Sequence, residues 1–316
     1  MHKKKFALIG VAGYIAERHV KAIKETDNEL IATLDKSDNV GFLDAYFPDA
    51  DFFCEFERFE RHIEKLSRTK DKIDYVSICT PNYLHDSQIR FALRHKAHAI
   101  CEKPLVLNPW NLDALEEIEK ETGKKIYTIL QLRLHPSVIK LKNKIENGPK
   151  DKIYDIDLAY ITSRGKWYHY SWKGDIEKSG GVATNIGIHF FDMLTWIFGE
   201  VKQNIIHISE KNIVAGYLEF EKARVRWVLS IDEKLLPQEC KEKGYRTHRS
   251  IKIENEEFEF SEGFNDLHTI LYKNILEGKG FGLKEAKKSI QIVYNIRNCN
   301  TVGIKGDYHP ILTKII

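Results

Sequence analysis

The chain lacks the features of a disulfide-bonded, membrane-spanning or secreted protein. Its five cysteines are odd in number and form no CxxC pair, which is typical of reduced thiols in a cytoplasmic protein. No apolar run approaches the roughly 20 residues that cross a bilayer. The basic start, MHKKKFALIG, continues into an apolar stretch too short for a signal peptide. We therefore expect a cytoplasmic protein with no membrane partner and no metal framework.

The chain also lacks an excess of either charge. Lys and Arg total 49 and Asp and Glu total 46, so the net charge is +3 and gives no reason to expect a nucleic-acid partner. A small anionic ligand remains compatible with this balance. The 316 residues, with 42% hydrophobic and 30% charged side chains, are typical of a globular protein of one or two domains.

Short apolar runs alternate with amphipathic segments over the first 130 residues. The runs are 5–9, 30–34, 73–79, 97–101 and 125–130, and helical patterns lie between them, as at 82–96 and 109–122. This alternation predicts a doubly wound parallel sheet of the Rossmann type. We expect residues 1–130 to form one domain of this type.

The pattern changes after residue 131. A helix is expected at 135–147, a long strand at 154–162 and an apolar helix at 185–198. Strands with hairpin spacing follow at 201–209, 214–220, 225–231 and 250–260, and helices at 264–276 and 283–298 complete the chain. Residues 131–316 are therefore expected to form a second, α/β domain, built on a largely antiparallel sheet with helices on one face.

A glycine-rich turn, LIGVAGYIAERH, follows the first strand. A helix N-terminus presents free N–H groups to a pyrophosphate, and glycine allows the backbone to approach it closely. The spacing is GxxGxxA rather than GxGxxG, so a tight turn without a ligand is the alternative. We expect cofactor contacts from the residues of this turn: Gly10, Ala12, Gly13, Tyr14 and Ile15.

The second strand ends at Asp35, where a carboxylate can bind the adenosine ribose hydroxyls. A carboxylate there repels a 2′-phosphate, which favours NAD over NADP, although the neighbouring Lys36 weakens the preference. A solvated acid at a strand end is the alternative interpretation. The turn Thr80-Pro81-Asn82 and the following His85 are expected beside the cofactor, at the carboxyl edge of the sheet.

The stretch CEKPLVLN places Glu102, Lys103 and Pro104 directly after an apolar run. A lysine held at this edge can accept a proton when burial or a nearby cation lowers its pKa. Glu102 would oppose that effect if its carboxylate is close. A structural lysine paired with an acid is the alternative.

Three stretches together resemble the glucose–fructose oxidoreductase, inositol dehydrogenase and rhizopine catabolism family of sugar dehydrogenases. They are the glycine turn, the EKP sequence and SGGVATNIGIHFFD at residues 179–192. Further segments, QLRLHP and RGKWYHYSWKGDIEKSGG, resemble the enzymes of this family that oxidise UDP-N-acetylglucosaminuronic acid. The resemblance implies that residues 1–130 bind NAD, with Glu102 and Lys103 among the cofactor contacts, and that residues 131–316 serve substrate binding and oligomerisation. It also implies oxidation of the sugar 3-hydroxyl to a ketone, in synthesis of O-antigen sugars by bacteria.

The resemblance also implies a second catalytic group, His189, which would share the hydroxyl proton with Lys103. Which of the two is the base is left open. Asn185 lies one helical turn earlier, where most of the family has an aspartate, and a neutral amide suits an anionic substrate. Asp192 can orient the imidazole. A metal would need a third ligand that this segment does not supply, so no metal is expected.

Further substrate contacts are expected from cationic and aromatic side chains. The loop at 164–174 offers Arg164, Lys166 and Lys173 for a diphosphate or a uronate, and Tyr168 and Trp172 for a ring, although an exposed strand would show the same alternation. Gln131 is expected at the cofactor and Arg133 at the substrate. Arg246 and Arg249 are more remote candidates, for this subunit or a neighbouring one.

Two other functions remain open from the sequence. One is a dehydrogenase of a free sugar, inositol or another polyol. The other is a sensor that binds NAD or a sugar without turnover, which the presence of Lys103 and His189 disfavours. The resemblance further implies a homo-oligomer, a dimer or a tetramer, and 2-oxoglutarate as one way to reoxidise the cofactor.

Overall fold

The structure is a computed structural model that describes residues 3–259 and 266–314. The chain divides into two compact units. The first unit comprises Met1–Leu134 and Asn265–Lys287, and the second comprises His135–Phe264 and Lys288–Ile316. The ends of two expected elements, at 260 and at 264–265, lie outside the described residues.

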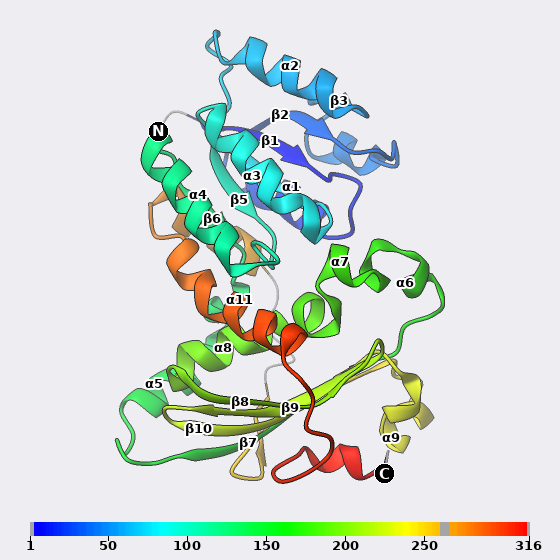
Figure 1. Cartoon of the computed structure of the whole chain (residues 1–316). Coiled ribbons are helices and arrows are strands. Elements are labelled where there is room, and N and C mark those ends of the chain that lie inside the picture. Colours follow the sequence, from blue (N-terminus) through cyan, green and yellow to red (C-terminus); the bar gives the residue numbers. More distant parts are fainter. Residues whose placement is uncertain (1–2, 260–265, 315–316) are drawn as a thin grey trace. The chain divides into compact units, whose positions relative to one another are not determined.

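The first unit is built on a six-stranded parallel sheet in the order β3-β2-β1-β4-β5-β6 (Figure 1). Its strands are β1 (Lys5–Ile9), β2 (Glu29–Leu34), β3 (Asp51–Phe53), β4 (Tyr75–Ile78), β5 (His98–Cys101) and β6 (Ile126–Thr128). Every residue of β4 is buried, as expected for a parallel strand that helices cover on both faces. The predicted Rossmann-type sheet is confirmed.

Helices connect these strands: α1 (Ala16–Glu25), α2 (Phe56–Leu66), α3 (His85–Arg94) and α4 (Pro109–Thr122). Helix α4 shows how local sequence sets the boundaries. It starts with Pro109, which needs no hydrogen-bond acceptor there, and stops at Gly123, whose φ of 66° is left-handed. The sheet order reverses between β1 and β4, so their carboxyl ends form the switch point where ligands of such sheets bind.

One helix of the first unit comes from far along the chain. Helix α10 (Leu267–Leu276) packs beside α1, and the ring of its Tyr272 lies 5.9 Å from that of Phe6 in β1. The chain then leaves this unit within α11 (Leu283–Asn298). The hydrophobic core around β1 therefore includes residues separated by more than 250 positions.

The second unit contains a mixed sheet in the order β12-β11-β7-β10-β9-β8. Its strands are β7 (Tyr154–Thr162), β8 (Val201–Ser209), β9 (Ile213–Phe220), β10 (Ala223–Ser230), β11 (Thr247–Ile253) and β12 (Glu256–Glu257). All neighbouring pairs are antiparallel except β7 and β10, which run parallel with Tyr154 opposite Ala223. The predicted, largely antiparallel sheet is confirmed, whereas the central parallel pair was not anticipated.

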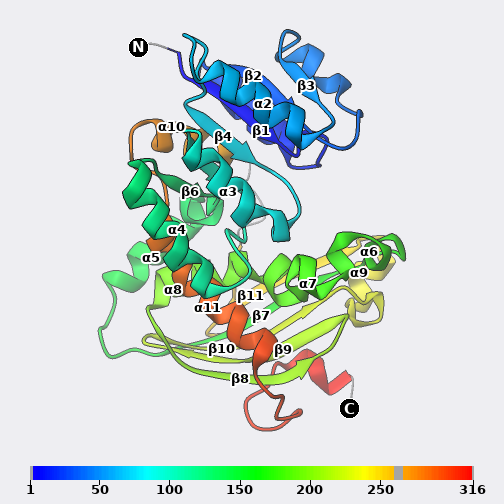
Figure 2. The ribbon, with the colours of Figure 1, turned by 45° about the horizontal axis from the view of Figure 1, so that its top comes forward.

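The two faces of this sheet are covered differently (Figure 2). Helices α5 (Pro136–Glu146) and α8 (Ile188–Phe198) lie on one face, where Phe191 of α8 meets Trp227 of β10 with ring centroids 5.2 Å apart. On the other face, Leu312 of the C-terminal segment packs into a cluster with Ala159, Ile161 and Val228. The expected placement of the helices on one face is thus confirmed.

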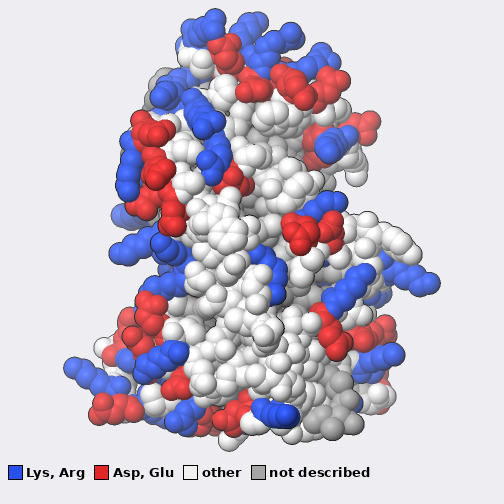
Figure 3. Space-filling view, in the orientation of Figure 1, with Lys and Arg blue, Asp and Glu red and all other residues white. Residues whose placement is uncertain are grey.

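The surface agrees with the balanced composition. Acidic and basic side chains are intermixed on the face shown in Figure 3. Among the described residues, no helix is both long enough and apolar enough to cross a membrane.

His98 at the start of β5 makes the first unit sensitive to acid. Its Nδ1 accepts a hydrogen bond of 3.0 Å from the Lys125 amide, and burial, together with the charge of Lys124, lowers its pKa to about 4. The unfolded chain titrates near 6.5, so this contribution to stability is complete above pH 6.5 and disappears as the pH falls toward 4.

We therefore expect His98→Asn, whose amide oxygen can accept the same bond without titrating, to unfold less readily in acid than the parent. The difference in the free energy of unfolding should grow by on the order of 2 kcal/mol between about pH 6.5 and about pH 4, after allowance for solvent screening. Urea titrations at both pH values measure it. Parallel pH dependence of the two proteins would contradict the assignment.

Candidate functional site

The glycine turn brings the start of α1 against the end of β4. Gly10 has φ +89°, and a Cβ there would lie 2.7 Å from the carbonyl carbon of Cys79. The Gly13 amide donates to the Gly10 carbonyl at 3.1 Å, and the Ala16 amide donates to the Gly13 carbonyl at 2.9 Å. Only glycine fits at position 10, because the neighbouring backbone occupies the space of a side chain.

The start of α1 is open for an anion. The residue at the N-cap position, Ile15, provides no side-chain hydrogen bond to the first turn. Tyr14, in the same turn, is 90% exposed. Free amides at the positive end of a helix dipole are a general binding feature for phosphate groups.

Asp35 is fixed beside this turn. Its Oδ2 accepts a hydrogen bond of 3.0 Å from the Ala12 amide, and its Oδ1 accepts one of 3.0 Å from the Ser37 amide. The carboxylate therefore joins the end of β2 to the glycine turn, and Lys36 next to it is exposed. A tight glycine turn, the start of a helix and a carboxylate at the second strand match the requirements of NAD.

His85, at the start of α3, joins two turns at the same edge of the sheet. Its Nε2 lies 2.9 Å from the carbonyl oxygen of Thr80, and its Nδ1 lies 2.7 Å from that of Pro104. The ring is fully buried, and burial lowers its pKa against the effect of these two carbonyls. The neutral imidazole donates to one of them, so His85 connects the Thr80-Pro81-Asn82 turn to the EKP turn (Glu102, Lys103, Pro104).

The remaining contacts of these turns stabilise their shape. Thr80 Oγ1 donates to Gln88 Oε1 at 2.6 Å, and Asn82 is buried. The EKP turn contains a cis peptide bond between Lys103 and Pro104. Lys103 is partly buried, and its amide donates to Glu102 Oε2 at 3.2 Å.

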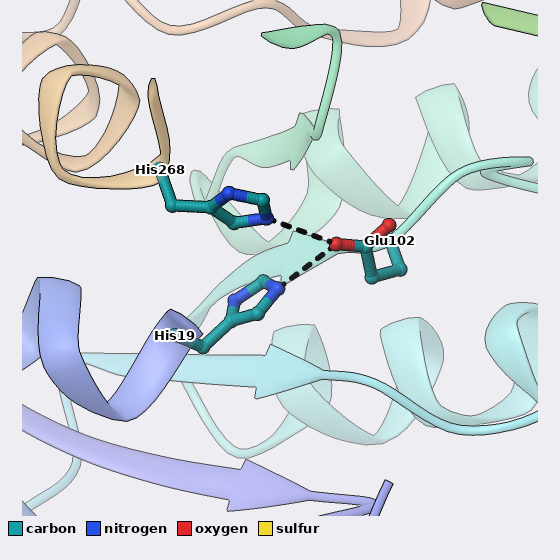
Figure 4. A group of neighbouring side chains, drawn as sticks. All are labelled: His19, Glu102 and His268. Atoms are coloured by element: carbon teal, nitrogen blue, oxygen red, sulfur yellow. Dashed lines mark hydrogen bonds and ion pairs between the residues drawn. The ribbon is translucent and has the colours of Figure 1, made fainter. Parts of the chain in front are cut away.

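Glu102 also accepts hydrogen bonds from two buried histidines. His19 of α1 and His268 of α10 each direct Nε2 at its Oε1, at 3.0 Å and 3.3 Å (Figure 4). Burial raises the pKa of this carboxyl, but the two histidines outweigh burial and hold the pKa well below its usual range. Glu102 is therefore an anion enclosed by the first unit.

Gln131 and Arg133 lie in the short helix η3 (Gln131–Leu134) of the first unit. The amide oxygen of Gln131 is buried with no hydrogen-bond partner in the described part of the chain, as expected for a group that binds a ligand. Arg133 is 9% exposed; its guanidinium donates to the Glu285 carbonyl at 3.2 Å and lies over the Phe281 ring. Arg133 is thus anchored within this unit.

The loop at 164–174 in the second unit folds into α6 (Trp167–Tyr170) and the short helix η4 (Trp172–Gly174). It does not form the exposed strand that was the alternative. Lys173 Nζ lies 5.6 Å from the ring centre of Trp167 and 5.7 Å from that of Trp172. Burial, with the charge of Arg164, lowers the pKa of Lys173. Arg164 and Lys166 are exposed.

Asn185 lies in a π-helical turn, η5 (Ala183–Gly187), that precedes α8. Its Nδ2 donates to the hydroxyl of the buried Tyr168 at 3.4 Å. His189 follows in the first turn of α8 and is partly buried, and Asp192 is 2% exposed. A single α-helix was expected over 185–198. The wider turn at its start is of a kind that occurs frequently at functional sites.

A pocket of about 310 Å³ opens beside this turn within the second unit. Its lining includes Tyr168 and Lys173, which the sequence indicated, and Lys211 and Arg297, which it did not. Burial lowers the pKa of Arg297 although Glu177 opposes the change. Three cations and one acid, Glu210, around one pocket favour an anionic ligand.

The two remote arginines lie on or next to strand β11. Arg246 donates to Ser163 Oγ at 3.5 Å, and Arg249 lies over the Tyr160 ring at 5.5 Å. Both contacts are within the second unit.

Several partners in these sites were not found from the sequence. His19, His268 and Tyr272 gave no signal, because a buried histidine in a helix has no distinctive pattern and α10 follows the rest of its unit by about 130 residues. His19 lies on the buried face of α1, with Ala16, Val20 and Ile23. That periodicity was the only available indication that it faces inward.

Comparisons with known proteins identify both units. The profile of the oxidoreductase family with an NAD-binding Rossmann fold matches residues 4–130, and that of its C-terminal alpha/beta domain matches 142–241. Inositol 2-dehydrogenase from Rhizobium meliloti is 31% identical over 204 residues, which cover 62% of this chain and 55% of that protein. The chain spans about half the length of the curated relatives it matches.

Solved structures match over the full length. The WlbA (WbpB) dehydrogenase from Thermus thermophilus, in complex with NAD and alpha-ketoglutarate, is 50% identical with a TM-score of 0.94, over 98% of this chain and all of that one. The WlbA dehydrogenase from Bordetella pertussis is 20% identical with a TM-score of 0.76, over 97% and 99% of the chains, and shows the fold alone. The chain therefore belongs to the glucose–fructose oxidoreductase, inositol dehydrogenase and rhizopine catabolism family of NAD-binding oxidoreductases.

Proposed function

We propose that the protein oxidises the 3-hydroxyl of UDP-N-acetylglucosaminuronic acid to a ketone with NAD. One observation carries the proposal: the Thermus thermophilus dehydrogenase, 49% identical over 98% of this chain, was solved in complex with NAD and UDP-GlcNAcA. The first unit would bind the cofactor, and the second unit would bind the sugar and form the oligomer.

NAD supplies the hydride acceptor when it is bound. The turn formed by Gly10, Ala12, Gly13, Tyr14 and Ile15 would border its pyrophosphate at the start of α1, and Asp35 would accept hydrogen bonds from the ribose hydroxyls. The Thr80-Pro81-Asn82 turn, the EKP turn and the unpartnered amide oxygen of Gln131 lie at the same edge of the sheet and complete the proposed cofactor site. His85 would contribute by holding two of these turns together.

The alcohol proton must leave the 3-hydroxyl as the hydrogen on that carbon departs as hydride. Lys103 would accept this proton in its neutral form, and His189 would contact the same hydroxyl, oriented by Asp192. Asn185 would donate to the sugar without the repulsion that a carboxylate would impose on a uronate. The Arg164–Lys173 loop and Arg133 would bind the diphosphate and carboxylate.

Four further assignments accompany this function. The Thermus thermophilus protein was also solved with NAD and alpha-ketoglutarate, which supports 2-oxoglutarate as the reoxidant of NADH. The five cysteines of the present chain are free, and we propose a cytoplasmic location, where thiols stay reduced. We also propose a dimer or tetramer, and a role in O-antigen sugar synthesis.

A second candidate is a polyol dehydrogenase, which the match to inositol 2-dehydrogenase supports. Titration calorimetry on NAD-loaded protein separates the two. We expect UDP-N-acetylglucosaminuronic acid to bind and UDP-N-acetylglucosamine, which lacks the carboxylate, to bind at least about tenfold more weakly. Equal affinities would contradict the proposal that the Arg164–Lys173 loop or Arg133 binds the carboxylate. Binding of myo-inositol alone would favour the second candidate.

Asp35 provides a test of cofactor choice. We expect Asp35→Ala to weaken NAD binding more than NADP binding, because the carboxylate binds ribose hydroxyls and repels a 2′-phosphate. Asp35→Asn is the control, since its side chain can still accept the Ala12 amide hydrogen and maintain the turn. Fluorescence titrations with both cofactors measure the ratio. Equal losses in Asp35→Ala for NAD and NADP would show that Asp35 only shapes the turn.

A further inference from the structure

A buried polar cluster lies behind the EKP turn, and the proposed chemistry does not use it. It joins three elements of the first unit: His19 in α1, Glu102 after β5 and His268 in α10 (Figure 4). Their exposed fractions are 0%, 7% and 4%. Both imidazoles point at the same carboxylate oxygen, Oε1, at 3.0 Å and 3.3 Å.

The positions of the protons follow from the charge of Glu102. A carboxylate only accepts hydrogen bonds, so the Nε2 of each histidine carries the proton directed at it. Burial lowers the pKa of His19 against the effect of Glu102, so its second nitrogen, Nδ1, is an acceptor. The hydroxyl of Tyr272 donates to this nitrogen at 2.7 Å, and the hydroxyl of Ser77 lies 2.7 Å from that of Tyr272.

The second oxygen of the carboxylate connects this cluster to the proposed active lysine. Glu102 Oε2 accepts the hydrogen bond from the Lys103 amide at 3.2 Å. One rigid carboxylate therefore contacts α1, α10 and the backbone of Lys103. Because α1 begins at the glycine turn, the cluster also links the proposed phosphate site to the EKP turn.

We propose that His19 and His268 are positioning residues that act on Lys103 through Glu102. Without both donors, a buried carboxylate takes up a proton or turns toward the nearest cation, and Lys103 is its neighbour in the chain. Uptake of a proton by Glu102 would displace the Lys103 backbone. Rotation of the charged carboxylate toward Lys103 would retain the lysine side chain as an ammonium ion. The inference rests on the proposed function in one respect, since Lys103 must be the group that accepts the proton.

His268 is the better site for a test, because His19 also bonds Tyr272 in the core. His268→Leu removes the donor to Glu102, and His268→Gln retains an N–H at a similar distance from the backbone. We expect His268→Leu to lower kcat at least about tenfold, with little change in KM or in NAD binding, and His268→Gln to restore most of the activity. Should the leucine variant fail to fold, His268→Asn, whose shorter amide falls short of Glu102, gives the same comparison.

A readout that needs no substrate separates this proposal from the proposed function. Amine-reactive labelling, followed by mass spectrometry, gives the rate at which Lys103 reacts relative to the exposed Lys166. We expect slower labelling of Lys103 in His268→Leu or His268→Asn and an unchanged rate in His268→Gln. If the variants show this pattern of labelling but the wild-type protein oxidises no UDP-sugar, the proposed function fails and the positioning role stands.

Two results would overturn the positioning role. One is a leucine or asparagine variant that lowers the melting temperature while kcat and Lys103 labelling match those of the glutamine variant, which would indicate a purely structural cluster. The other is a stoichiometric metal ion in the purified protein, measured by elemental mass spectrometry. The ligand atoms of these three side chains lie within 4.8 Å of one another, and a metal there would make Glu102 a ligand rather than a hydrogen-bond acceptor.

Discussion

Lys103→Met is expected to lower turnover of the UDP-sugar about 10³-fold or more while leaving NAD binding nearly intact. General base catalysis contributes a factor of roughly 10² to 10⁴, and methionine fills a similar volume without an amine. The backbone of the EKP turn should persist, because the bond from the amide of residue 103 to Glu102 does not depend on the side chain at this position. Steady-state kinetics, with a parallel NAD titration, measure the two effects separately.

Lys103→Arg is the matched control for charge. Arginine keeps a cation on a long stem but does not deprotonate in proteins, so it should be nearly as inactive as methionine. Activity in the arginine variant would indicate that Lys103 acts as a cation that orients the sugar, and His189 would then become the base. Substantial turnover in Lys103→Met would remove the proton-transfer role altogether.

The first unit was predictable where a local pattern determines the structure. Residues 5–9 were expected as a strand and form β1, because a strand buried on both faces must be continuously apolar. The short strand β3 was not identified, since its residues Asp51–Phe53 are at most partly buried and give no apolar run. The packing of α10 into the first unit depends on contacts with α1 that no local sequence pattern predicts.

The candidate sites divide in the same way. Asp35 and Lys103 could be nominated because each directly follows a recognisable strand, where parallel sheets place ligand contacts. Other members of these sites come from distant segments: His268, which bonds Glu102, lies in a helix far along the chain. Lys211 and Arg297, which line the pocket of the second unit with Lys173, come from two separate segments of that unit. Sequence spacing locates a strand end well, but it does not report which buried side chains point toward it.

The second unit shows the limit most clearly at β7 and β10. Hairpin spacing between β8, β9 and β10 predicts antiparallel neighbours, and those pairs are antiparallel. Strand β7 precedes them by a long connection that contains α8, which allows it to join β10 in parallel. The π-helical turn at Asn185 was likewise not predictable, because the hydrophobic pattern of 185–198 fits an uninterrupted α-helix.

Gly10→Ala is expected to be the most damaging substitution in the proposed phosphate turn. Alanine at φ +89° is strained by roughly 1–3 kcal/mol. Its Cβ would also lie 2.7 Å from the Cys79 carbonyl carbon and 2.8 Å from the Thr80 nitrogen, both backbone atoms. The ends of β1 and β4 would have to separate. We expect a loss of about 3 kcal/mol or more in the free energy of unfolding, together with loss of NAD binding.

Gly123→Ala separates the two causes of that loss. Gly123 also has a positive φ, +66°, but a Cβ there meets no atom within 4 Å among the described residues. It should therefore cost only the backbone strain, about 1 kcal/mol, and leave NAD binding unchanged. Urea unfolding and NAD titration of both variants test this. Equal destabilisation by the two substitutions would mean that the turn can open without resistance from β4, and the close approach at Gly10 would then not be what shapes the cofactor site.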